Sequence, residues 1–325
     1  MLKKVVFYFI MLGLMLGLVE VFAFVTVQVI DHDDFFDSRN QVLARLNETD
    51  LAEFKSTSAD PVTGWNWHGP LEREEANCLG DMIAYHYDAA GARLHPLFDA
   101  AKSEVVVVGD SYTNGTEVGD SEAFPAKLSG LLGVSVANHG VGGYDPTQSL
   151  LNLQEHISRY PRAKVVVLVI MYENLYRMLN SYRPVLYTQS SDFTLKPYMM
   201  NGHIVPHPGP RVFDSLAQFK QVAETTFDTD FWTKPVAEFP YSIALGKSLA
   251  SNYLYYRRLQ GALSKMLGKP EYFLIFSSDE IRLNLIALLN QYAIMVSVSL
   301  SPLAHSLRNS VRAHSMAVIA RWPHR

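Results

Sequence analysis

Three short apolar segments, each followed by a polar loop, constrain the fold of this chain more than any other feature. Residues 104–111 read EVVVVGDS, a β-branched run of the kind that forms a parallel strand buried on both faces. VSVAN at 134–138 and AKVVVLVIM at 163–171 have the same character. Residues 122–133 and 146–160, which lie between these runs, show helical spacing. This alternation predicts a parallel sheet with helices on both faces.

Polar residues follow each of the three predicted strands. They are GDS at 109–111, NHGVGGYD at 138–145 and YEN at 172–174. The carboxyl ends of parallel strands meet at one edge of a sheet, and ligands bind beyond that edge. The sequence therefore predicts one functional site built from the three loops.

Ser111 is the candidate nucleophile of this site. A serine hydroxyl attacks a carbonyl only when a base takes its proton and N–H donors stabilise the oxyanion. The Ser111 N–H, a glycine N–H from the second loop and the Asn174 side chain are candidate donors. In the alternative interpretation, Asp110 and Ser111 only cap the next helix and the glycines only form turns. The presence of all three loops in order favours the catalytic interpretation.

The three loops resemble the conserved blocks of the SGNH (GDSL-type) hydrolases. GDSYTNG at 109–115 is similar to the first block, which implies Ser111 as nucleophile and oxyanion donor. The second-block glycine falls at Gly143, with Gly140 as the alternative. The third block usually reads Gly-x-Asn-Asp, whereas MYENLYR keeps Asn174 for the oxyanion hole and has Leu175 in place of the aspartate. The resemblance implies a flavodoxin-like three-layer α/β/α sandwich with a parallel sheet.

The resemblance is closest to membrane-anchored bacterial members of the family. These carry a tryptophan-containing segment before the first block and a D-x-x-G-x-R segment, here Asp88 to Arg93. It covers roughly residues 60–292 and implies a serine esterase that forms an acyl-serine intermediate. The substrate would be an acylated carbohydrate of the envelope or an exported polysaccharide, deacetylated or acetylated by the enzyme, or another ester.

The family's acid–base pair, Asp-x-x-His near the C-terminus, is missing from this sequence. None of the 11 histidines follows an acidic residue at that spacing, and no acidic residue follows Glu280. The part from about 293 to 325 is therefore atypical. Three explanations stay open: a frameshift or truncation after about Tyr292, a divergent tail whose His305 or His314 reaches Ser111, or a fold that has lost catalysis and serves as a binding or scaffolding module.

Two further predictions concern the second loop and the tail. His139 lies in the second loop, and we expect a structural histidine hydrogen-bonded to backbone rather than a substitute base. The run MVSVSLSPLA at 295–304 is interpreted as a further strand of the sheet.

Residues 5–30 form an apolar stretch that follows Lys3 and Lys4 and is interrupted only by Glu20 and Gln28. It is long enough to span a bilayer core of about 30 Å. The lysines before it and the acidic DHDDFFD after it predict a single-pass anchor in the inner (cytoplasmic) membrane, with the globular part on the periplasmic side. A cleaved signal peptide is the alternative.

The sequence thus predicts an anchor at 1–30, a stalk and lead-in segment at 31–100, and a hydrolase-like domain at 101–325. The net charge of −4 provides no basic surface for nucleic acid. No Gly-x-Gly-x-x-Gly or Walker loop follows the first strand, so we expect no cofactor and no metal. The single cysteine, Cys78, excludes an intrachain disulfide.

Overall fold

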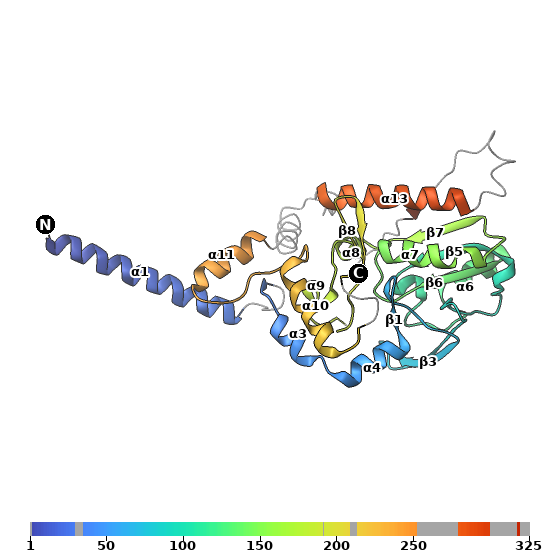
Figure 1. Cartoon of the computed structure of the whole chain (residues 1–325), viewed down its shortest axis with the longest axis horizontal. Coiled ribbons are helices and arrows are strands. Elements are labelled where there is room, and N and C mark those ends of the chain that lie inside the picture. The colour runs from blue at the N-terminus through green and yellow to red at the C-terminus, as the bar shows by residue number, and fades with distance from the viewer. Residues whose placement is uncertain are drawn as a thin grey trace. The chain divides into compact units, whose positions relative to one another are not determined.

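The computed structural model describes residues 2–29, 35–190, 192–208, 213–251, 279–299 and 317–318 (Figure 1). Contacts between residues divide the chain into two compact units. The first unit comprises Met1–Leu46, Tyr182–Asp192 and Ala223–Leu274, and the second comprises Asn47–Ser181, Phe193–Val222 and Ile275–Arg325. The second unit therefore contains the sheet and also the greater part of the segment 31–100 that precedes it.

A parallel sheet forms the centre of the second unit. Its middle strand, β5 (Ser103–Gly109), pairs with β6 (Ser135–Gly140) on one side and with β7 (Val165–Val169) on the other. Val107 lies opposite Asn138 of β6 and Val167 of β7. The two residues of β10 (Ala317–Val318) extend the sheet beyond β7, also in parallel. The predicted parallel α/β sheet is confirmed. β7 lies within its predicted segment, whereas β5 begins one residue earlier and β6 extends two residues further than predicted.

Successive side chains of a strand point to opposite sides of the sheet, and on β6 each side contacts a different helix. Val136 belongs to an apolar cluster with Val105 and Val107, against which Leu128 of α6 (Phe124–Leu132) packs. His139 points to the other side, where its ring stacks on a histidine at the end of α7 (Pro146–His156). A capping box at Asp145 and Pro146 in the first turn explain why α7 begins where the sequence predicts.

The segment before the sheet is more regular than its sequence suggests. It contains the helix α4 (Glu48–Thr57), the short strand pair β1 (Ala59–Asp60) and β2 (Gly64–Trp65), and an antiparallel hairpin of β3 (Leu71–Ala76) and β4 (Met82–Tyr87). The sequence LEREEA of β3 alternates between half-buried and exposed residues. Because its half-buried face also carries charged residues, apolar periodicity did not identify this strand.

Further elements complete the second unit. They are η1 (Ala100–Lys102), α5 (Ser111–Asn114), η2 (Ile157–Arg159), α8 (Tyr172–Arg177), the hairpin β8 (Tyr198–Met200) and β9 (His203–Val205), the first half of α10 (Leu216–Thr229), and α13 (Asp279–Ser299).

The strand expected at 295–304 is wrong over its first five residues, which belong to the helix α13. The helix continues from residue 279, and it buries Ile281, Leu285, Leu288 and Tyr292 on one side. The Tyr292 hydroxyl donates to the carbonyl of Pro146 at 3.0 Å, so this face packs on α7. The β-branched residues that follow extend an established helix, because packing outweighs their modest strand preference. Residues 300–304 lie outside the described residues.

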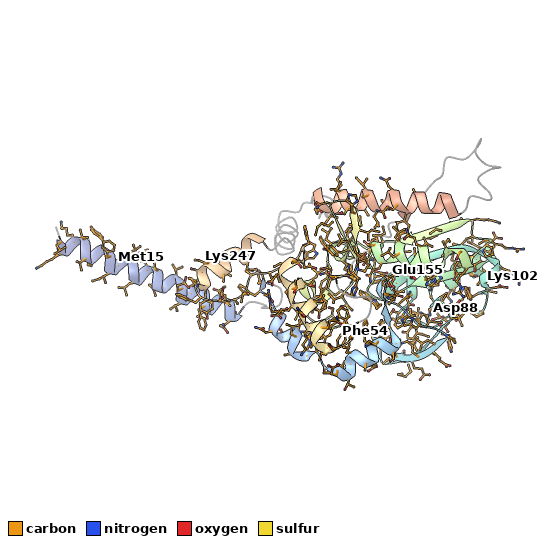
Figure 2. All side chains as sticks on the ribbon, in the orientation of Figure 1. Met15, Phe54, Asp88, Lys102, Glu155 and Lys247 are labelled. Carbon is orange, nitrogen blue, oxygen red and sulfur yellow. The ribbon has the colours of Figure 1, made fainter. Side chains whose placement is uncertain are left out.

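The first unit contains α1 (Leu2–Val29), α3 (Arg39–Arg45), α9 (Arg183–Leu186), α11 (Tyr241–Ser251) and the second half of α10. Within the described residues, α1 is the one helix long and apolar enough to cross a membrane. Its side chains project freely along most of its length, as at Met15 (Figure 2). Only its last third is partly covered, and α11 provides that cover.

Candidate active site

Ser111 is the first residue of α5, which follows β5 with only Asp110 between them. Asp110 caps this helix, since its side-chain oxygen Oδ1 accepts the Tyr112 N–H at 3.0 Å. The Ser111 side chain is half-buried, and neither its hydroxyl nor its N–H makes a hydrogen bond with any described residue. Asp110 therefore caps α5, as the alternative interpretation holds, whereas the hydroxyl and N–H of Ser111 have no hydrogen-bond partner among the described residues.

Gly140 allows α5 to lie directly on the end of β6. A Cβ atom at Gly140 would come within 2.1 Å of the Asn114 nitrogen and 2.5 Å of the Thr113 carbonyl carbon. Any side chain at this position would therefore displace the helix that begins with Ser111. The Gly140 N–H donates to Asn138 Oδ1 at 3.0 Å, so it is not free to stabilise an oxyanion. Gly143 is the other glycine that the resemblance implies for this role.

Gly143 lies in a tight turn after β6, with a φ angle of 79°. The Tyr144 N–H donates to the carbonyl of Val141 at 3.2 Å and closes the turn. The Trp65 indole N–H donates to the carbonyl of Gly142 at 3.0 Å, and the Tyr144 hydroxyl donates to the carbonyl of Trp65 at 2.6 Å. The tryptophan-containing segment before the sheet thus fixes the conformation of the second loop.

Asn174 reaches the first loop from α8, which follows β7. Its side-chain nitrogen donates to Asp110 Oδ2 at 3.0 Å, and its oxygen accepts from Arg177 at 3.1 Å. One amide hydrogen is thereby used, and the other has no partner among the described residues. Leu175 is buried, which suits an apolar residue at the position where the resembled block has aspartate.

The three loops converge as the sequence predicts. The bond between Asn174 and Asp110 joins the third loop to the first. The Val141 N–H donates to the carbonyl of Gly109 at 3.1 Å and joins the second loop to the first. The structure therefore brings the loops of Ser111, Gly143 and Asn174 to one edge of the sheet.

A buried ion pair, which no sequence pattern indicated, links the second and third loops. Lys196 and Asp145 have side chains that are 0% exposed, and the ammonium group donates to Asp145 Oδ2 at 2.5 Å. The same ammonium donates to the carbonyl of Arg177, the last residue of α8, at 2.7 Å. Because Asp145 also caps α7, one lysine fixes the start of α7 and the end of α8.

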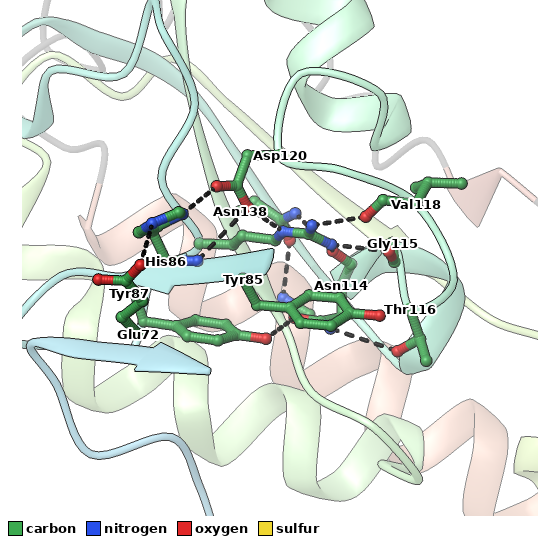
Figure 3. A network of polar contacts seen from close by, with 12 residues as sticks. Glu72, Tyr85, His86, Tyr87, Asn114, Gly115, Thr116, Val118, Asp120 and Asn138 are labelled. Atoms are coloured by element: carbon green, nitrogen blue, oxygen red, sulfur yellow. Dashed lines mark hydrogen bonds and ion pairs between the residues drawn. The ribbon is translucent and has the colours of Figure 1, made fainter. Parts of the chain in front are cut away.

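Arg93, the last residue of the D-x-x-G-x-R segment, holds the end of α5, and Figure 3 labels its partners Asn114, Gly115, Val118 and Asp120. Its side chain is 1% exposed, and one guanidinium nitrogen donates to the carbonyls of Asn114 and Gly115 at 2.7 Å each. A second nitrogen donates to the carbonyl of Val118 at 2.7 Å, and Nε donates to Asp120 at 2.9 Å. Arg93 therefore satisfies the last carbonyls of the helix that starts with Ser111, and it acts on the site as a positioning residue.

A second layer of side chains surrounds this arginine (Figure 3). The Tyr85 ring lies 4.6 Å from the guanidinium carbon, and the Tyr87 hydroxyl donates to Asn114 at 3.1 Å. The His86 ring is hydrogen-bonded to Asp120 at 2.5 Å and lies 3.3 Å from Glu72. The hydrogen bond with Asp120 raises the pKa of His86 above its ordinary value, and Glu72 adds to this effect.

The first residue of the same segment forms the turn that presents Arg93. Asp88 Oδ1 accepts the N–H groups of Ala90 and Ala92 at 2.8 and 3.0 Å. Gly91 has a φ angle of 74°, and a Cβ atom there would meet the carbonyl oxygen of Trp67 at 2.5 Å. Aspartate, glycine and arginine thus have three separate roles at one turn, which explains the spacing of the motif.

His139 is a structural histidine, as predicted, but its ring is hydrogen-bonded to the Tyr160 hydroxyl and not to backbone. Its Nε2 atom is 2.6 Å from the Tyr160 hydroxyl, its ring stacks on His156, and Asn152 donates to its carbonyl. Burial lowers the pKa of His139 well below its ordinary value, so the ring is neutral at pH 7. Within the described residues, no histidine forms a hydrogen bond with Ser111. His305 and His314 lie outside the described residues.

A comparison of the chain with protein-family models finds no match, and a comparison with curated proteins finds none either. The SGNH resemblance therefore rests on the residues named above and stays a prediction.

Proposed function

We propose that the protein is a serine esterase that cleaves or transfers acyl groups through an acyl-serine at Ser111. One observation carries this proposal: the hydroxyl and N–H of Ser111 make no hydrogen bond with any described residue, at a sheet edge where Asn174 is tied to Asp110. Specific hydrogen bonds fix the loops around Ser111, but the hydroxyl and N–H of Ser111 take part in none of them. This arrangement suits a reacting group better than a turn serine.

The proposed reaction follows from the chemistry of these groups. Ser111 Oγ forms a bond to the acyl carbonyl carbon while a base accepts its proton, and the carbonyl oxygen becomes an oxyanion. The Ser111 N–H, the Gly143 N–H and the second amide hydrogen of Asn174 stabilise that charge. The alkoxide leaving group departs with the proton, and water or a sugar hydroxyl then releases the acyl group. The base is a histidine of the tail, and His305 and His314 are the candidates.

The proposed setting is the periplasmic side of the inner membrane, with α1 as the anchor. The substrate is an acylated carbohydrate of the envelope or of an exported polysaccharide, or another ester, and the fold is the three-layer SGNH sandwich. The length and apolar surface of α1 support the anchor, and the positive flank supports its orientation.

The test uses the full-length chain in detergent, with p-nitrophenyl acetate as substrate and a fluorophosphonate as a covalent probe of activated serine. We expect hydrolysis above the buffer rate, one fluorophosphonate adduct at Ser111, and loss of both in Ser111→Ala. The matched control is Ser56→Ala, which changes an exposed serine of α4 and should retain both signals. Equal rates for wild type and Ser111→Ala, without an adduct, would refute the proposal.

A second candidate function is a binding or scaffolding module that has kept this fold without catalysis. It is favoured by one observation, since within the described part of the chain no acid–base pair contacts Ser111. Variants of His305 and His314 separate the two functions. If replacement of either histidine by alanine abolishes the Ser111 adduct, the result supports the esterase. If no adduct forms in the wild type or in either variant, the result supports the binding module.

A further inference from the structure

Glu20 is the only acidic residue in the apolar stretch of α1. With Lys3 and Lys4 at one membrane boundary, about 20 residues of helix cross the hydrocarbon core and reach the other boundary near residue 24. Glu20 then lies about one helical turn inside the second boundary. A carboxylate at this depth is costly unless a protein group satisfies it.

Ser242, the second residue of α11, satisfies Glu20. The Ser242 N–H lies 3.3 and 3.4 Å from the two carboxylate oxygens, and the Ser242 hydroxyl is hydrogen-bonded to one of them. The first N–H groups of a helix have no partner within the helix, and the helix dipole favours an anion there. Glu20 therefore caps α11 from a different helix.

α11 lies beside the end of α1 (Figure 1), and apolar packing extends the contact along it. The rings of Phe24 and Tyr241 meet edge to face, with their centroids 5.1 Å apart. Val27 forms a buried cluster with Phe36 and Ala244. One face of α11 is thus fixed against the end of α1 that emerges from the predicted membrane.

Apolar side chains of α11, and of the turn before it, are exposed. Ile243 is 53% exposed, Phe239 just before the helix is 71% exposed, and Leu249 is also exposed. The helix sequence YSIALGKSLAS contains no acidic residue, and its one charged residue is Lys247 (Figure 2). The hydrogen bonds between Glu20 and Ser242 keep the start of α11 next to α1.

We propose that α11 is an interfacial helix that lies in the outer boundary of the membrane that α1 spans, with Phe239, Ile243 and Leu249 in contact with lipid acyl chains. Lipid is the partner of these side chains because the Glu20–Ser242 contact holds the start of α11 at the depth of the hydrocarbon boundary. This inference rests on the proposed membrane anchor and is independent of the proposed esterase reaction.

The experiment places single cysteines in the full-length chain with Cys78→Ser, which removes the native exposed thiol. Ile243→Cys and Leu249→Cys test α11, Leu12→Cys tests the anchor, and Leu131→Cys is the control, an exposed leucine of α6 in the second unit. Each cysteine is labelled with NBD, and the protein is reconstituted into vesicles of phosphatidylethanolamine and phosphatidylglycerol. Some vesicles carry a nitroxide lipid spin-labelled near the headgroup, and others carry one labelled near the bilayer centre.

We expect the shallow nitroxide to quench NBD at 243 and 249 more than the deep one, and the deep nitroxide to quench NBD at 12. NBD at 131 should lose no fluorescence with either lipid. Quenching at 12 without quenching at 243 and 249 would overturn the interfacial helix and leave the anchor intact. An absence of quenching at 12 would overturn the anchor and, with it, this inference. Equal quenching at 131 and 243 would overturn the assignment to α11.

Discussion

Asn174 donates its side-chain amide to Asp110 at 3.0 Å, and this hydrogen bond ties the loop after β7 to the loop that carries Ser111. The same amide nitrogen has one further hydrogen, which the proposed reaction directs at the oxyanion. Asn174 thus has two roles: it holds two loops of the site together, and it is a proposed donor to the oxyanion.

Asn174→Ala should lower kcat for ester hydrolysis by about 10²–10³-fold, because removal of one oxyanion donor has that effect in serine hydrolases. KM should change little, since the oxyanion forms only in the transition state. The measurement is steady-state hydrolysis of p-nitrophenyl acetate, with Asn40→Ala, an exposed asparagine of α3, as the control. A variant that raised KM and kept kcat would show that Asn174 binds substrate instead.

Arg93→Lys should reduce the free energy of unfolding by about 2–4 kcal/mol, because a lysine cannot serve three carbonyls and a carboxylate from one ammonium group. The rate of fluorophosphonate labelling at Ser111 should fall even below the unfolding transition, since the end of α5 loses its support. Denaturant titration and labelling rates check both effects. Arg282→Lys, at an exposed residue of α13, should change neither.

The sequence predicted those parts of the fold that depend on local signals. The valines of β5 form a buried strand, and Pro146 begins a helix, because apolar runs, helical spacing and capping are local signals. The run at 163–171 forms the strand β7, but β7 is less buried than predicted, with Val165 exposed and only Leu168 buried. The same reasoning failed at 295–299, where a β-branched run continues α13. There the buried Leu288 and Tyr292 on the preceding turns decide the conformation.

The loops of the site followed from the order of strands, but the contacts that hold them did not. Lys196 pairs with Asp145 across 51 residues, and His86 pairs with Asp120 across 34. Such pairs depend on tertiary structure, and no spacing in the sequence indicates them. The sequence indicated Arg93 only as part of the D-x-x-G-x-R motif. Its four side-chain partners lie at residues 114–120, and no spacing in the sequence links them to Arg93.

The pair of His86 and Asp120 should make stability depend on pH. The pKa of His86 is raised in the folded protein, so protonation of His86 stabilises the fold. This contribution is fully present below the unfolded-state pKa of about 6.5 and is lost as pH rises through the higher folded-state value. The side chain is 42% exposed, so solvent screening limits the effect to below about 1 kcal/mol.

The measurement for His86 is denaturant unfolding between about pH 5.5 and 8.5 for wild type, His86→Gln and His203→Gln, an exposed histidine of β9. The difference between wild type and His86→Gln should shrink as pH rises through the range where His86 loses its proton. His203→Gln should follow the wild-type curve. A difference that grew with pH would mean that Asp120 does not favour the charged form of His86.

Lys196→Met should destabilise the protein by about 3–5 kcal/mol, because it leaves the buried Asp145 carboxylate without its cation. Lys196→Met combined with Asp145→Asn removes both charges and should recover part of this loss. Asn retains the capping oxygen of α7, so the helix start is preserved. Denaturant titration of the two single variants and the double variant measures the coupling. Lys127→Met, at an exposed lysine of α6, should have little effect.

Glu20→Ala should loosen α11, because charge-assisted hydrogen bonds of roughly 1.5–3 kcal/mol to Ser242 are lost. Amide hydrogen exchange in α11 should then accelerate by about 10- to 100-fold in reconstituted vesicles, while exchange in β5 and α7 stays unchanged. The control Glu48→Ala, at an exposed residue of α4, should leave exchange in α11 as in the wild type. If exchange in α11 were equally slow in Glu20→Ala, apolar packing on Phe24 and Val27 would hold the helix without the carboxylate.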